Sequence, residues 1–175
     1  MITVRDARLP DDAPAIAAID TSFSTETIFR VEVGEEAIRL REVTLDRPLA
    51  RRLPLDDLAD PDRPWETAFV AVDGQAIVGF VATARSSWSG RLTLWHLYVE
   101  PARRGRGVGR ALVARVMDEA VASGAEHVWL ETSNLNVPAV AFYRRLGFAL
   151  CGADTTLYAG TPAEGETALF FARKV

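Results

Sequence analysis

A loop rich in glycine and arginine is the part of the sequence whose residue types most clearly suit binding chemistry. Residues 97–112 read LYVEPARRGRGVGRAL, and Gly105, Gly107 and Gly109 alternate just before a predicted helix. Glycines let the backbone approach a ligand closely, and the first amides of a helix favour an anion. Four arginines lie in the same segment: Arg103, Arg104, Arg106 and Arg110. These residues predict a site for a phosphate or pyrophosphate, and a glycine turn with solvated arginines is the simpler alternative.

Two familiar phosphate-binding motifs are absent from this loop. A P-loop requires a lysine followed by Ser or Thr after its last glycine, and the loop contains no lysine. The dinucleotide fingerprint GxGxxG requires a glycine at position 110 or 112, where Arg110 and Leu112 stand. The order of strand, proline, arginine, glycines and amphipathic helix therefore favours another kind of phosphate site.

Residue patterns predict the elements that position this loop. Strands are expected over 2–9, 28–33, 37–45, 67–72, 75–84, 91–99, 127–132, 148–152, 156–160 and 168–175. Helices are expected over 11–20, 108–124 and 136–147, the first capped by Asp11 or Asp12. Residues 21–27 are expected to be a connection, and Pro48–Pro64 a solvated excursion. The order of elements predicts the α/β fold class with an α+β mixed sheet, in one domain over residues 1–175.

Composition excludes several classes of function. The 20 basic and 24 acidic residues give a net charge of −4, without the basic face of a nucleic-acid binder. One cysteine excludes an internal disulfide framework, and two histidines without HExxH predict no metal. No run reaches the roughly 20 apolar residues that span a bilayer, and the charged N-terminus lacks a signal core. We therefore expect a cytoplasmic protein without nucleic-acid or membrane partners, whose edge hairpins would permit a homodimer.

Two blocks of sequence resemble the Gcn5-related N-acetyltransferase (GNAT) superfamily. Residues 99–109 match the motif V-x-P-x-x-[RQ]-G-x-G-x-[GA], and residues 136–148 match N-x-x-A-x-x-F-Y-x-x-x-G-F. The resemblance covers nearly the whole chain. It implies the GNAT fold, in which a mostly antiparallel twisted sheet, flanked by helices, splays at the acetyl-CoA site. It also implies an N-acetyltransferase that uses acetyl-CoA as cosubstrate.

The resemblance implies which residues bind acetyl-CoA. The loop amides would bind the pyrophosphate, the strand before the loop would pair with the pantetheine arm, and an asparagine of the second block would contact the coenzyme. On this chain the cofactor-binding residues are Leu97, Tyr98, Val99, Arg104, Gly105, Arg106, Gly107, Val108, Gly109, Arg110, Asn136 and Ala139.

Acetyl transfer to an amine needs a neutral amine and a proton for the leaving thiolate. By resemblance Tyr143 is the general acid, and its alternative role is that of a core tyrosine. Glu131, at the end of a strand, is the expected base, against the alternative of a surface salt bridge. His96 is the rival base because its ordinary pKa lies near 6.5, and strict alternation places it on one face with Leu92, Leu94 and Tyr98. Cys151 is expected to be an inert core thiol.

Residues 20–33, 38–43 and 129–170 narrow the resemblance to streptothricin acetyltransferases, which acetylate an amine of a cationic antibiotic. The expected substrate is a small molecule with a primary amine, contacted by Glu32, His96, Asp154 and Glu166. In those enzymes the strand before the glycine loop carries acidic residues, whereas this chain has Trp95, His96 and Tyr98 there. A peptide or protein N-terminus, a polyamine, or a non-catalytic acyl-CoA-binding role remain the alternatives.

Overall fold

The structure is a computed structural model that describes residues 1–175, and the chain divides into two compact units. One unit comprises Met1–Ser22, Arg52–Val128 and Lys174–Val175, and the other comprises Phe23–Arg51 and Trp129–Arg173. The first contains β1 (Ile2–Asp6), α1 (Ala13–Ala17), β4 (Thr67–Asp73), β5 (Ala76–Ser86), β6 (Arg91–Val99), η1 (Pro101–Arg103) and α2 (Val108–Ala122). The second contains nearly all of β2 (Ser22–Val33), β3 (Ile38–Arg52), β7 (His127–Ser133), α3 (Val137–Arg145), β8 (Ala149–Asp154) and β9 (Ala168–Lys174).

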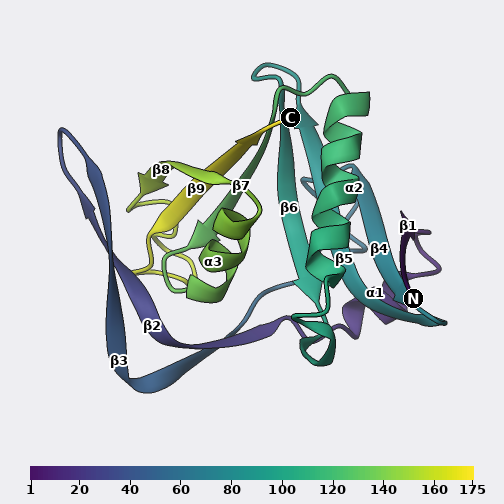
Figure 1. Ribbon diagram of the computed structural model, residues 1–175, viewed down its shortest axis with the longest axis horizontal. Helices are drawn as coiled ribbons and strands as arrows, with labels where there is room; N and C mark the ends of the chain where they lie inside the picture. The colour runs from purple at the N-terminus through teal and green to yellow at the C-terminus, as the bar shows by residue number, and fades with distance from the viewer. The chain divides into compact units, whose positions relative to one another are not determined.

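Antiparallel strands in the order β1-β4-β5-β6 form the sheet of the first unit. Strands β4 and β5 form a hairpin at Asp73-Gly74, and Gly74 has the positive φ of 64° that its turn requires. Helix α2 runs along β5 and β6 (Figure 1). A Cβ at Gly79 of β5 would lie 3.0 Å from the Leu112 side chain, so this glycine allows α2 to pack closely on the strand.

Apolar side chains cover both faces of this sheet. On the α2 side the helix buries these apolar residues: Val108, Leu112, Val113, Val116 and Ala120. On the other side Phe80 and Tyr98 pack in a cluster with Ile16 of α1, Leu58 and Trp65. The segment Pro48–Pro64 was expected to be a solvated excursion, and most of its residues are exposed, but Leu58 is buried in the core and residues 48–52 belong to β3.

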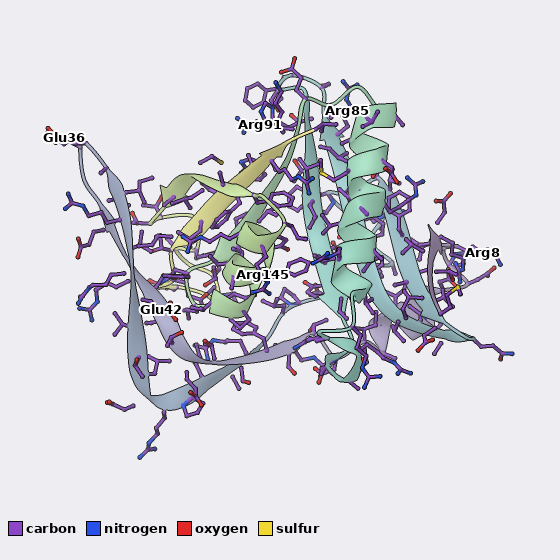
Figure 2. The ribbon with its side chains drawn as sticks, viewed as in Figure 1. Arg8, Glu36, Glu42, Arg85, Arg91 and Arg145 are labelled. Atoms are coloured by element: carbon purple, nitrogen blue, oxygen red, sulfur yellow. The ribbon has the colours of Figure 1, made fainter.

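The second unit contains strands in the order β7-β9-β8 and the separate pair β2-β3. Strands β8 and β9 are antiparallel, with Ala149 opposite Ala172. Figure 2 shows Glu36 at the tip of the long β2–β3 hairpin and Glu42 farther along it. Helix α3 begins after Asn136, whose side-chain oxygen accepts a hydrogen bond from the Ala139 amide at 3.2 Å.

The structure confirms a mixed α/β fold with a mostly antiparallel sheet and corrects several boundaries. Residues 21–27 are mostly strand, because β2 begins at Ser22, and β3 continues through Pro48 to Arg52. The strand expected over 156–160 is a turn. Cys151 is exposed rather than a core residue.

The cap of α1 also differs from expectation. Asp12 occupies the N-cap position, but its carboxylate makes no capping bond. Instead it pairs with the Arg5 guanidinium at 2.6 Å and accepts a hydrogen bond from the Arg8 amide at 2.7 Å. These contacts hold the pKa of Asp12 at about 2, mainly through the bond from Arg5.

Candidate functional site

The loop between β6 and α2 has the backbone conformation that its glycines predict. Gly105 and Gly107 have φ angles of 75° and 85°, in the region that side chains disfavour. Helix α2 begins directly afterwards at Val108, so its first amides have no partner inside the helix. The space that a Cβ would occupy at either glycine is open. The loop can therefore present several amides to one anion, which fits a pyrophosphate group.

The arginines of this loop have different surroundings, and Arg103 forms an ion pair with Asp73 at 3.2 Å. Arg106 and Arg110 are exposed and add positive charge beside the helix N-terminus. Arg104 donates from Nε to the Val99 carbonyl at 2.9 Å and from Nη2 to the Asp20 carbonyl at 3.3 Å. Arg104 thus fastens the loop to the end of β6, which is a positioning role in addition to the phosphate contact that we predict for it.

Strand β6 leads directly into this loop. Its last residues Leu97, Tyr98 and Val99 pair with Val81, Phe80 and Gly79 of β5. This pairing fixes the direction in which the chain enters the glycine loop. A pantetheine contact by these three residues stays a prediction.

A β-bulge in β6 changes the face on which His96 lies. Thr83 pairs with Leu94, whereas the adjacent Ala82 pairs with His96, so Trp95 is the extra residue. His96 therefore shares the Phe80 face with Tyr98, and not the face of Leu92 and Leu94. The expectation from strict alternation is wrong for this pair of leucines.

Both ring nitrogens of His96 have neighbours. Its Nε2 lies 2.8 Å from Asp57 Oδ2, and its Nδ1 lies 3.3 Å from the Tyr98 hydroxyl, which donates to the Pro54 carbonyl at 2.8 Å. Asp57 Oδ2 also accepts a hydrogen bond from the Trp65 indole at 2.8 Å. These contacts hold His96 against the segment before β4.

Glu131 lies in the middle of a polar cluster in the second unit. Its Oε1 accepts a hydrogen bond from the Tyr158 hydroxyl. Burial raises the pKa of Glu131, the bond from Tyr158 lowers it in part, and the negative charge of Glu166 raises it. Glu166 in turn accepts a hydrogen bond from Ser133 and lies 3.8 Å from the Arg51 Nε. A half-buried carboxylate whose pKa is raised is a suitable proton acceptor at neutral pH.

The remaining predicted residues of this unit lie in different surroundings. Tyr143 is buried on α3, with its ring against Phe142 and Phe148 at centroid distances of 5.4 Å and 5.6 Å. Asp154 accepts hydrogen bonds from the Thr156 hydroxyl and amide and from the Leu157 amide, and these bonds lower its pKa. Glu32 is exposed on β2. Of the predicted substrate residues in this unit, only Glu166 joins the Glu131 cluster.

Four residues that contact the predicted site residues or join the neighbouring segments were not predicted from the sequence. Tyr158 and Arg51 complete the Glu131 cluster, and Asp57 holds His96. The buried Asn134 donates to the Phe29 carbonyl at 2.7 Å and accepts from the Thr167 amide at 2.8 Å, so it joins β2 to the segment before β9. Each partner lies far along the chain, so no local pattern signals these contacts.

Comparison with known proteins identifies the class to which this fold and these residues belong. The sequence profile of the Acetyltransferase (GNAT) family matches residues 35–148. The chain belongs to this family and is an acetyltransferase, as its two motifs predict. No helix of the structure is long and apolar enough to cross a membrane, and no group of three or more His, Cys, Asp or Glu side chains could hold a metal ion.

The individual proteins that resemble this chain are more informative than the family profile. The chain is 45% identical over 174 residues to a streptothricin acetyltransferase of Streptomyces lavendulae, covering 95% of this chain and 91% of that protein. The crystal structure of a nourseothricin acetyltransferase is 44% identical with a TM-score of 0.87, covering 99% of this chain and 98% of that one. A Bacillus anthracis structure in complex with acetyl coenzyme A is 22% identical with a TM-score of 0.85, covers 100% of both chains, and shows the shared fold. The predicted resemblance to streptothricin acetyltransferases is confirmed.

Proposed function

We propose that the chain transfers the acetyl group of acetyl-CoA to a primary amine of a streptothricin-type antibiotic and thereby inactivates it. The observation that carries this proposal is the likeness to a streptothricin acetyltransferase over 95% of the chain. That length includes residues after position 148, which the family profile does not reach. This C-terminal part contains Tyr158 and Glu166 of the Glu131 cluster. The whole of residues 1–175 would then act as one acetyltransferase domain, and we propose the cytoplasm as its location.

The glycine loop supports acetyl-CoA as the donor. The amides from Gly105 to Gly109 would hold the pyrophosphate, and the exposed Arg106 and Arg110 would add positive charge beside it. Residues 97–99, Asn136 and Ala139 would contact the rest of the coenzyme. Bound there, acetyl-CoA supplies an acetyl thioester that an amine can attack.

Glu131 and Tyr143 would handle the protons. The substrate amine is an ammonium ion at neutral pH and must lose a proton before it can attack. The Glu131 carboxylate would accept that proton, and the Tyr143 hydroxyl would donate one to the departing sulfur. Glu131 is favoured over His96 as the base because Asp57 and Tyr98 already contact the two nitrogens of His96.

The acidic residues would orient a cationic substrate. Glu166 lies beside Glu131, and the chain carries a net charge of −4, which favours the approach of a cation. Glu32 and His96 are further candidate contacts. Asp154 is the weakest of them because its carboxylate already binds the turn at Thr156 and Leu157.

The test is to incubate the purified protein with acetyl-CoA and nourseothricin, and to follow thiol release together with acetylation of the antibiotic by mass spectrometry. We expect turnover, and we expect a sensitive bacterium that expresses the protein to survive nourseothricin. If the protein acetylates peptides or polyamines but no streptothricin, the proposed substrate is refuted. If the protein binds acetyl-CoA but releases no thiol with any amine of a test panel, the chain is instead a binding module.

A further inference from the structure

Tyr158 contacts the carboxylate that we propose as the base. Glu131 alternates along β7 with Trp129 and Ser133, so these three side chains share one face of the strand. Phe170 of β9 stacks on Trp129 with ring centroids 5.1 Å apart. Tyr158 comes from the connection between β8 and β9, and its hydroxyl donates a hydrogen bond to Glu131 Oε1.

We propose that Tyr158 is a positioning residue for Glu131: its hydroxyl fixes one carboxylate oxygen and leaves the other to accept the proton of the incoming ammonium group. This inference rests on the proposed function, because it assumes that Glu131 is the base. The proton moves from the substrate nitrogen to the free carboxylate oxygen, and solvent removes it after the transfer. Tyr158 keeps its own proton, since burial and the bond to Glu131 raise its pKa well above the ordinary tyrosine value.

The connection that carries Tyr158 is held in place by its own hydrogen bonds. Asp154 binds Thr156 and Leu157, immediately before Tyr158. After it, the Thr161 hydroxyl donates to the Tyr158 carbonyl at 2.7 Å. The phenol is therefore presented from a structured turn. Asp154, which the sequence suggested as a substrate contact, serves here to build that turn.

Glu166 and Tyr158 act on the protonation of Glu131 in opposite directions. Glu166 adds a negative charge that favours the protonated form of Glu131, and Arg51 of β3 lies 3.8 Å from Glu166. Ser133 donates to Glu166 and carries no charge. The hydrogen bond from Tyr158 favours the ionised form. Tyr158 is thus the group that counteracts burial at this carboxylate.

Removing the hydroxyl should therefore change how the rate depends on pH. In Tyr158→Phe the half-buried carboxylate loses its donor, so the pKa of Glu131 rises further and the base is ionised only at higher pH. A hydrogen bond to a charged group changes an equilibrium by about ten- to a hundredfold. On the acid limb, kcat/KM should fall by about that factor, while the rate at high pH approaches that of the parent. Glu166→Gln should shift the acid limb of kcat to lower pH.

The experiment measures pH–rate profiles with nourseothricin for the parent, Tyr158→Phe and Thr155→Val. Thr155→Val is the matched control, because it removes a hydroxyl from an exposed residue of the same connection that forms no hydrogen bond with Tyr158 or Glu131. A second readout is a carboxyl NMR titration of protein labelled with carbon-13 glutamate, in which the Glu131 signal is identified by its loss in Glu131→Gln. Circular dichroism and thermal unfolding confirm that each variant is folded.

We expect the acid limb and the Glu131 titration to move to higher pH in Tyr158→Phe and to stay in place in Thr155→Val. A uniform loss of activity at every pH, or an equal shift in both variants, would overturn the positioning role. Failure of the parent to acetylate nourseothricin would refute the proposed function instead. The NMR titration needs no substrate, so an unmoved Glu131 signal in Tyr158→Phe would still refute the inference about Tyr158.

Discussion

Replacing Gly107 tests whether the loop before α2 binds acetyl-CoA through its backbone. Gly107 has a φ of 85°, and a Cβ at this position would meet no atom within 4 Å. Gly107→Ala therefore creates no clash within the protein, and its cost comes from the backbone alone. An L-residue in the left-handed region costs about 1–2 kcal/mol.

How that cost divides between folding and binding is informative. The loop is exposed, so an alanine there can relax to a negative φ in the free protein. Relaxation turns the amides away from one point, and acetyl-CoA must then restore the strained conformation. If the whole cost falls on binding, the Kd rises by about 5- to 30-fold. Gly107→Val should bind more weakly still, because its branched side chain would occupy the open space that the phosphates need.

Gly90 provides a matched control for this substitution. It lies in the turn before β6, has a φ of 62°, and would also place a Cβ in open space. Gly90→Ala should therefore carry a similar backbone cost without changing the affinity for acetyl-CoA. Isothermal calorimetry measures the Kd, and urea unfolding measures the free energy of unfolding of each variant. If Gly107→Ala and Gly107→Val bind acetyl-CoA as tightly as Gly90→Ala, the loop is not the phosphate site.

Two other substitutions test the acid and the pH dependence of stability. Tyr143→Phe should retain the fold and the affinity for acetyl-CoA while turnover falls by about 10²–10⁴, and near-parental turnover would return Tyr143 to a packing role. Asp12→Asn should lower the free energy of unfolding at pH 7, because folding lowers the pKa of Asp12 from 3.8 to about 2. Solvent screens the partly exposed partner Arg5, so the expected loss is only about 1 kcal/mol. A lowered carboxyl pKa stabilises the fold above about pH 4, so in urea unfolding the difference should shrink as the pH falls toward about 2, and a difference independent of pH would contradict the assignment.

The parts of the fold that the sequence predicts well are set by neighbouring residues. The Asp73-Gly74 hairpin, strand β6 and the stop of α2 near Gly124 depend on turn residues and on periodicity within a few positions. The glycine loop is similar, because positive φ angles at Gly105 and Gly107 are a local requirement. These features could be predicted because their causes lie next to them in the chain.

Contacts between distant residues account for most of what was missed. Glu131 and Tyr158 are 27 positions apart, and Asp57 and His96 are 39 positions apart. Prolines and aspartates made the segment around Asp57 look solvated, yet Trp65 is 2% exposed and its indole binds that carboxylate. Long-range packing therefore decided the segment around Asp57 against its local pattern. Residues 156–160 differ, because the Asp154 side chain accepts hydrogen bonds from the Thr156 and Leu157 amides and forms a local turn where a strand was predicted.

The bulge at Trp95 breaks the strict alternation of side chains along β6. Of all the departures from local rules, this one has the largest consequence for the site. Without it, His96 would share a face with Leu94 and lie beneath α2, away from Asp57 and Trp65. The one extra residue moves His96 onto the face of Tyr98, where Asp57 binds it, and leaves Trp95 half-exposed between the two registers. Bulges re-aim side chains beside functional sites, and β6 is the strand that leads into the glycine loop. Strict alternation therefore fails on the strand that leads into the glycine loop, where one extra residue decides which side chains face the segment around Asp57.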